Sequence, residues 1–89
     1  MSQAATYWAM SRRGIIAQNK VILLYLADAH QFGQPTVVSE KYLVAQTELD
    51  EDALRAGLNA LQDIALIKYL VCHNQVVRCV LSVPMDGAT

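Results

Sequence analysis

Two helix N-termini with the same capping pattern follow one another in the middle of the chain, and they constrain the fold more than any other feature. Ser39 and Asp50 are both good N-cap residues, because a side-chain oxygen at that position accepts from a free backbone N–H of the first turn. In both cases an apolar residue before the cap can pack on another in the helix that follows. These pairs are Val38 with Leu43 and Leu49 with Leu54. The sequence therefore predicts helices at residues 40–46 and 51–64, joined by a short turn at residues 47–49.

An earlier apolar segment predicts a further helix that is buried on most of its surface. It starts at residue 18 or 19 and ends at about residue 31, with Gly33 suited to follow the helix end. Apolar side chains surround almost the whole circumference, which is typical of a core helix or of one whose outer side meets a partner. Residues 35–38 then predict a very short β-strand.

The last apolar segment, residues 66–83, predicts a β-hairpin, because β-branched and aromatic residues stand on both sides of a polar interruption. We expect Asn74 and Gln75 to form a two-residue turn. The pairs on one face are then Cys72 with Val77 and Leu70 with Cys79, and those on the other are Val71 with Arg78 and Tyr69 with Val80. Both faces are largely apolar. One covers the core, and the other is partly bare unless the N-terminal segment or a second chain covers it.

No repeat, low-complexity tract or Pro/Gly-rich linker divides the 89 residues. We therefore expect one domain at residues 19–83, an N-terminal lead segment at 1–18 and a C-terminal tail at 84–89. The first part of the lead is expected to be irregular, with Tyr7, Trp8 and Met10 packing partly on the domain. Hydrophobic residues make up 54% of the chain and charged residues 17%, a composition that excludes disorder.

Charge and hydropathy restrict the location and the partners. The longest apolar run, residues 21–27, is far shorter than the roughly 20 residues that a membrane span needs. The first residues carry no basic region ahead of an apolar one, so we expect a cytoplasmic protein without a membrane partner. The formal net charge of −1 gives no overall attraction to nucleic acid, so such binding would require a local basic patch.

Residues suited to catalysis or metal binding are few and scattered. His30 and His73 stand apart from any nucleophile pattern, so no enzymatic activity is predicted. Cys72 and His73 would point to opposite faces of a strand, and with Cys79 they make a poor three-ligand set. We expect neither a metal nor another cofactor. Both cysteines are interpreted as small buried hydrophobic residues.

The order of predicted elements, which is helix, short strand, helix, tight turn, helix and hairpin, resembles that of a winged helix-turn-helix domain. Residues 8–70 resemble the small winged helix-turn-helix domains of phage and plasmid replication proteins and of small bacterial transcription regulators. The residues that carry the resemblance are Trp8, Lys20, Val21, Ile22, Leu23, Leu24, Leu26, Ala27, Asp28, His30, Gly33, Pro35, Ser39, Leu43, Thr47, Leu49, Leu54, Leu58, Leu61, Leu66 and Ile67. The resemblance implies an α+β fold with three helices, a short strand and a C-terminal β-hairpin.

The resemblance also implies that a homodimer binds double-stranded DNA, in transcription regulation or DNA replication. The helix at 51–64 would enter the major groove, with Arg55 and Asn59 on the face that reads it. Further contacts would come from Lys41, Lys68, Arg12 and Arg13, with Arg78 of the hairpin as an additional cation. Arg12 and Arg13, a pair in the lead segment, either enter a minor groove as an arm or remain solvated.

Acidic residues occupy positions where DNA-binding relatives usually carry Ser, Thr, Arg or Lys. Glu48, Asp50, Glu51 and Asp52 surround the start of the helix at 51–64, and Glu48 stands where a turn glycine is common. These acids would repel phosphate, which disfavours docking of this helix unless the carboxylates accept from cytosine amino groups. They either only cap the helix and complement its dipole, or form a functional negative surface. The alternative prediction is therefore a winged helix that binds a protein partner through these acids and its apolar faces, with little or no DNA binding.

Overall fold

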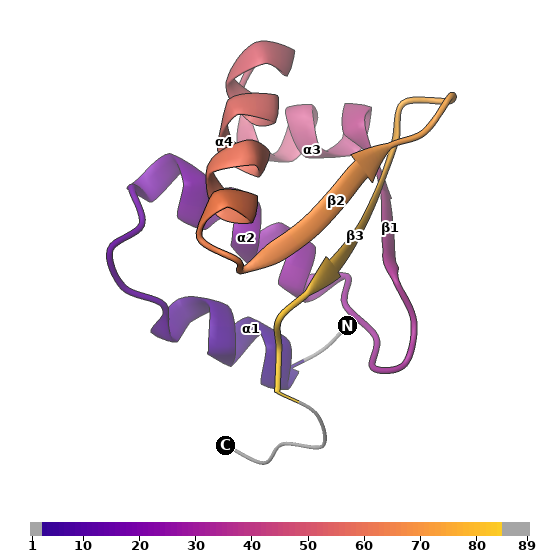
Figure 1. The fold of residues 1–89 in the computed structure, drawn as a ribbon. Helices are drawn as coiled ribbons and strands as arrows, with labels where there is room; N and C mark the ends of the chain where they lie inside the picture. The colour runs from indigo at the N-terminus through magenta and orange to yellow at the C-terminus, as the bar shows by residue number, and fades with distance from the viewer. Residues whose placement is uncertain (1–2, 85–89) are drawn as a thin grey trace.

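Four helices pack on one face of a three-stranded antiparallel sheet in the computed structural model, which describes residues 3–84 (Figure 1). Their order along the chain is α1 (Gln3–Ser11), α2 (Ala17–Asp28), β1 (Thr36–Ser39), α3 (Glu40–Thr47), α4 (Glu51–Asp63), β2 (Ile67–Val71) and β3 (Val76–Leu81). The last strand, β3, lies in the middle of the sheet, between β1 and β2. The α+β class is as predicted, with one helix more than the three expected.

The two predicted helix starts are confirmed by their cap hydrogen bonds. The hydroxyl of Ser39 accepts from the backbone N–H of Tyr42 at 2.9 Å, and the carboxylate of Asp50 accepts from that of Ala53 at 2.7 Å. Helix α3 ends at Glu48, whose φ of 60° is left-handed. Because that residue reverses the chain, α4 begins after only a short turn.

Helix α2 is the core helix that the sequence predicts, although it begins and ends slightly earlier. After Asp28 the last turn tightens, because the N–H of His30 donates to the carbonyl of Ala27, three residues back, at 3.1 Å. Its contact with α4 depends on Gly57. A Cβ at that position would collide with the side chain of Ile22 and lie 2.8 Å from Oδ1 of Asn19.

The expectation of an irregular N-terminal lead is wrong, because residues 3–11 form helix α1. Its buried residues, Ala5, Trp8 and Ala9, pack against α2, and this burial supports a helix too short to be stable alone. Tyr7 and Met10 do not anchor it, since they are 73% and 56% exposed.

The predicted hairpin exists, but its register is one residue off. The loop holds three residues, 73–75, rather than two, and Gln75 adopts a left-handed φ of 57°. The backbone N–H of Cys72 donates to the carbonyl of Val76 at 2.8 Å. When the register shifts by one residue, each residue pairs with the neighbour of its expected partner. Two side chains expected to lie together on one face then lie on opposite faces of the sheet. The observed pairs are Ile67 with Leu81, Lys68 with Val80, Tyr69 with Cys79, Leu70 with Arg78 and Val71 with Val77.

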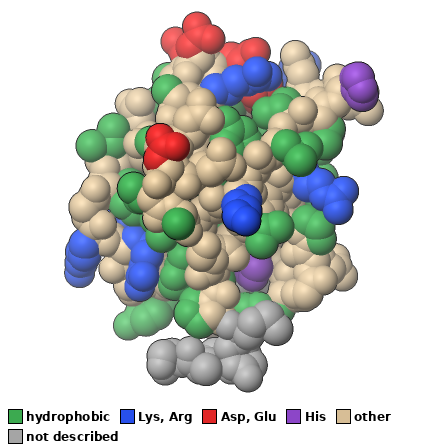
Figure 2. All heavy atoms as spheres, in the orientation of Figure 1, with side chains coloured by type: hydrophobic (Ala, Val, Ile, Leu, Met, Phe, Trp, Pro, Cys, Tyr) green, Lys and Arg blue, Asp and Glu red, His purple; other side chains and the backbone are tan. Residues whose placement is uncertain are grey.

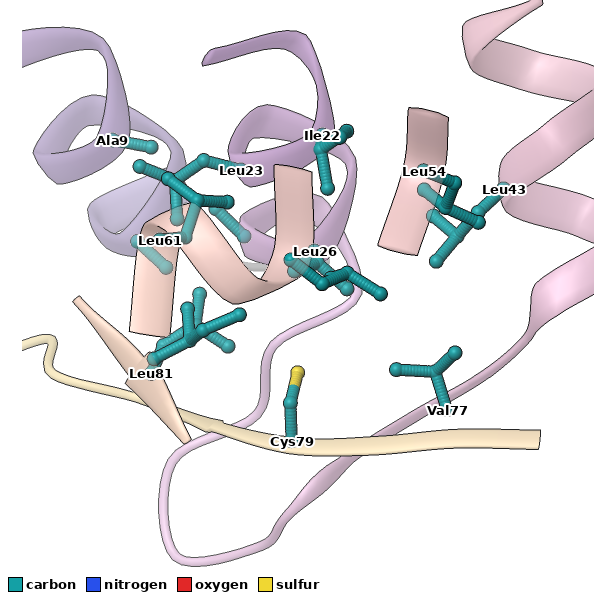
Figure 3. Close-up of a cluster of buried hydrophobic side chains, with 14 of the residues drawn as sticks. Ala9, Ile22, Leu23, Leu26, Leu43, Leu54, Leu61, Val77, Cys79 and Leu81 are labelled. Carbon is teal, nitrogen blue, oxygen red and sulfur yellow. The ribbon is translucent and has the colours of Figure 1, made fainter. Parts of the chain in front are cut away.

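The core lies between the inner face of the sheet and the helices, and Figure 3 shows aliphatic side chains from α1, α2, α3, α4 and β3 converging there. Cys79 lies among them, 1% exposed, and burial raises the pKa of its thiol to about 12. Cys79 is thus the small buried residue that was predicted, whereas Cys72 is exposed. The fully buried aliphatic residues include Ile22, Leu23, Leu26, Leu43, Leu54, Leu58 and Leu61.

Candidate functional site

The face of the sheet turned away from the helices carries exposed apolar side chains. Val37, Leu70 and Val80 are 57%, 56% and 59% exposed. Arg78 pairs with Val37 on one side and Leu70 on the other, and Lys68 pairs with Val80. These five residues, called the outer sheet face below, form one patch in which two cations alternate with three apolar side chains. Helix α1 packs on α2 and does not cover it.

A groove of about 760 Å³ borders the outer sheet face at the connection from α4 to β2. Its shape depends on a sharp link at Ala65, which has a left-handed φ of 64°. The hydroxyl of Ser82 holds that link by donating to the carbonyl of Ala65 at 2.8 Å. The lining residues are Gln62, Ala65, Ile67, Lys68, Tyr69, Val80, Leu81 and Ser82. The groove gives the sheet face a concave border into which side chains of a partner can insert.

Arg55, the first residue predicted to read DNA, is bound to the start of α3. Its Nε and Nη2 donate to the two carboxylate oxygens of Glu40 at 2.7 and 3.1 Å, and Glu51 lies 3.7 Å from Nη2. The Glu40 side chain is 3% exposed and that of Arg55 43%. The hydrogen bond and the charge of Glu40 raise the pKa of Arg55 above its ordinary value. Arg55 thus neutralises a buried carboxylate.

Asn59, the second predicted reading residue, faces the edge of the sheet. Its Oδ1 accepts from the hydroxyl of Tyr69. One turn further on, Oε1 of Gln62 accepts from the backbone N–H of Tyr69 at 2.9 Å. Because β2 is an edge strand, this bond satisfies a donor that would otherwise be free. The polar face of α4 is therefore engaged by α3 and β2.

The four predicted acidic residues lie together around the start of α4 and are called the acidic turn below. Asp50 is the N-cap, and Glu48 is the left-handed residue that ends α3. Glu51 and Asp52 are exposed in the first turn of α4. Within residues 3–84, neither Glu48 nor Asp52 lies within ion-pair distance of a basic side chain. The acidic turn thus combines a structural role with unpaired negative charge.

The remaining predicted cations lie in different environments. Lys41, Lys68 and Arg13 are exposed. Arg12 lies over the ring of Trp8, 5.5 Å from its centroid, and its Nε donates to the Trp8 carbonyl at 3.1 Å. Arg12 is therefore fixed on α1 rather than extended on an arm, and the structure does not bring it together with Lys41 or Lys68 in any contact between described residues.

Metal-ligating side chains do not gather anywhere in the described part of the chain, where no three of them could hold an ion. No helix formed by residues 3–84 is long and apolar enough to cross a membrane.

Two residues with distinctive roles, Glu40 and Tyr69, were not singled out from the sequence as site residues. Both bind the polar face of α4. Arg78, a predicted supplementary cation, lies at the centre of the outer sheet face. Glu40 and Arg55 stand on different helices, so no single periodic pattern links them. The contribution of Arg78 depends on the hairpin register, which a two-residue turn places incorrectly.

Comparison with models of protein families, with curated proteins and with solved structures finds no match to this chain. The outer sheet face, its groove and the acidic turn are therefore the features on which a functional proposal rests.

Proposed function

We propose that the chain is a winged helix-turn-helix protein that acts through protein contact, and that the outer sheet face binds a second copy of the same chain. The succession of α2, β1, α3, α4 and the β2–β3 hairpin supports the winged-helix assignment, with α1 as an addition before it. The short turn between α3 and α4, and the antiparallel hairpin that follows them, agree with that arrangement.

The observation that carries this proposal is the outer sheet face itself. Three apolar side chains, each more than half exposed, lie on the three strands around Arg78 and beside a groove. Clustered apolar surface of this kind is typical of contact sites, because covering it removes unfavourable contact with water. The polar face of α4 offers no comparable surface for DNA, since Arg55, Asn59 and Gln62 are already bound within the chain.

Charge complementarity favours a second copy as the partner. Lys68 and Arg78 have no carboxylate within ion-pair distance among residues 3–84, and the acidic turn has an excess of carboxylates. Figure 2 shows most of the visible Asp and Glu side chains at the end of the molecule where α4 begins, whereas Lys and Arg side chains are spread over the same view. In a two-fold dimer each contact occurs twice. The acidic turn of each copy would then meet Lys68 and Arg78 of the other.

Charge reversal tests this arrangement. One variant carries Lys68→Glu with Arg78→Glu, and another carries Glu51→Lys with Asp52→Lys, which leaves the Asp50 cap in place. Each variant alone should have its dimerisation constant weakened by about tenfold or more, which corresponds to about 1.4 kcal/mol. An equimolar mixture should dimerise again, because both reciprocal contacts regain opposite charges. Sedimentation equilibrium at increasing protein concentration measures all three samples.

The matched control is Arg13→Glu, which reverses an exposed charge away from the sheet and should leave dimerisation unchanged. A wild-type chain that stays monomeric to its solubility limit would overturn the proposal. So would two folded variants whose mixture shows no recovery. Circular dichroism establishes that each variant is folded.

A second candidate function, binding to double-stranded DNA, is favoured by one observation. Lys41, Lys68 and Arg78 are exposed and, in the described part of the chain, unpaired, so they could contact phosphate oxygens. The acidic turn opposes this function by repelling the same phosphates.

Fluorescence anisotropy with mixed-sequence duplex DNA, at low and at physiological salt, separates the two functions. DNA binding predicts micromolar affinity that falls steeply with salt, is lost on Lys68→Glu with Arg78→Glu, and increases on Glu51→Lys with Asp52→Lys. Protein contact predicts that both double variants lose association with a second copy, and that the wild-type chain does not bind the duplex.

A further inference from the structure

His30 is a buried polar side chain without a hydrogen bond. It is 7% exposed, and in the described part of the chain neither ring nitrogen has a partner. An imidazole carries an N–H in either neutral tautomer, and buried polar groups of folded proteins nearly always have partners. An apolar side chain would fill the same place without burying an unpaired N–H group. The imidazole therefore needs a hydrogen-bond partner that the described residues do not supply.

A pocket of about 310 Å³ lies beside His30, where the connection from α2 to β1 passes the end of β3. This volume is at the small end of the range for ligand pockets. The walls are mostly apolar and include no Lys, Arg, Asp or Glu side chain. Apart from His30, they are Phe32, Gly33, Gln34, Pro35, Val80, Leu81 and Val83.

Phe32 forms the wall that lies directly against His30. Its ring stands edge-on to the imidazole of His30, with centroids 4.9 Å apart and planes at 84°, and the residue is 40% exposed. The backbone around it forms a hydrogen-bonded turn, in which Gly33 has a φ of 82° and the N–H of Gln34 donates to the carbonyl of Gln31 at 3.2 Å. The ring nitrogens are shielded from solvent. Binding to them therefore requires the Phe32 side chain, which packs against the imidazole, to turn outward.

The chemistry of the walls restricts the ligand. A charged group would be buried without a counter-charge, which is unfavourable. A hydroxyl both donates and accepts, so it pairs with the imidazole whichever nitrogen carries the proton. The mostly apolar walls, which include Phe32 and Pro35, favour a ligand whose body behind that hydroxyl is apolar. We propose that this pocket binds a small uncharged phenol whose hydroxyl forms a hydrogen bond with a ring nitrogen of His30. Burial also lowers the pKa of His30, which keeps the imidazole neutral at pH 7.

Imidazole NMR provides a direct test, because the chain has only two histidines. The histidine-labelled full chain is titrated with 4-methylphenol, and His73→Gln assigns the remaining signal to His30. We expect a saturable shift of the His30 resonances with a Kd of about 1 mM or tighter. The exposed His73 should not shift. Toluene, which lacks the hydroxyl, should bind at least about tenfold more weakly, a difference of about 1.4 kcal/mol.

A His30→Phe variant keeps an aromatic ring and removes both nitrogens. It should lose binding of 4-methylphenol, monitored by the methyl resonances of the pocket residues Val80, Leu81 and Val83. Absence of a His30 shift up to the solubility limit of 4-methylphenol would overturn the proposal, and equal affinity for toluene would overturn the role of the hydroxyl. If His30→Phe fails to fold, the titration of the wild-type chain with both probes still decides.

Discussion

The guanidinium of Arg55 donates two hydrogen bonds to the buried carboxylate of Glu40, from Nε to Oε2 at 2.7 Å and from Nη2 to Oε1 at 3.1 Å. The backbone N–H of Glu40 donates in turn to the carbonyl of Gln75 at 2.8 Å. Glu40 therefore joins α3, α4 and the hairpin loop. A residue predicted to contact DNA is part of the internal framework.

Substitutions in this pair should have unequal effects on stability. Arg55→Ala leaves a buried carboxylate without its partner, whereas Glu40→Ala leaves a guanidinium that can turn to water. We expect Glu40→Ala to lower the free energy of unfolding by about 1–2 kcal/mol, and Arg55→Ala to lower it further. In urea denaturation, the free energy of unfolding of the double variant should fall by less than the sum of the decreases in the two single variants. Strict additivity would show that the two side chains are not coupled.

Gly57→Ala should destabilise the protein even though alanine favours a helix by about 1 kcal/mol over glycine. The added methyl group would collide with Cδ1 of Ile22, which is fully buried, so packed core side chains would have to shift. The neighbouring exposed residue gives the control, since Ala56→Gly should lose about 1 kcal/mol through helix propensity alone. Thermal unfolding of both variants measures the difference. A higher midpoint for Gly57→Ala would mean that α2 and α4 are further apart than described.

Glu48→Gly should stabilise the protein by about 0.5–1 kcal/mol, because glycine adopts the left-handed φ of 60° without steric cost. Glu48→Asn should give a smaller gain, and Glu48→Val should destabilise, since a β-branched residue is least tolerant of this conformation. Urea midpoints of the three variants should follow the order Gly, Asn, Val. Any other order would indicate that the turn between α3 and α4 has a different backbone.

The stability of the protein should fall as the solution becomes mildly acidic. Burial lowers the pKa of His30 below its ordinary value of 6.5, so the unfolded chain binds a proton there more readily than the folded chain does. The contribution of His30 is then fully present above pH 6.5 and decreases as the pH falls through that value. Urea unfolding at a series of pH values measures it.

Two variants identify the source of that pH dependence. In His30→Phe the free energy of unfolding should depend less on pH as the pH falls through 6.5. At mildly acidic pH the variant should be more stable than the wild-type chain, because no imidazole remains to be charged. His73→Gln should keep the wild-type profile, since His73 is exposed on the hairpin loop. An unchanged slope in His30→Phe would assign the dependence to other groups.

Local signals predicted the helices well, because a cap needs only neighbouring residues. Ser39 and Asp50 bond to N–H groups three residues away, and the sequence alone locates both. The expected core residues Leu54, Leu58 and Leu61 are buried for the same reason, since the periodicity of a helix determines which face they share.

Predictions that depended on a loop conformation or on distant contacts were less successful. Gln75 is not a residue type that signals a left-handed turn, so the three-residue loop and the register went undetected. Helix α1 is supported by tertiary burial of Trp8 that no local pattern encodes. For the candidate site, the sequence identified the acidic turn, Lys68 and the possibility of a bare apolar face of the hairpin. The pairing of Arg55 with Glu40 requires two helices to be placed relative to each other.

The central position of β3 also determines when the protein can fold during its synthesis. Both β1 and β2 pair with β3, yet β3 is the last of the three strands to leave the ribosome. Until residues 76–81 have emerged, the helices have no sheet to cover their apolar faces, and Leu43 and Leu54 lack their neighbour Val77. The native core therefore forms only after almost the entire described chain has been translated.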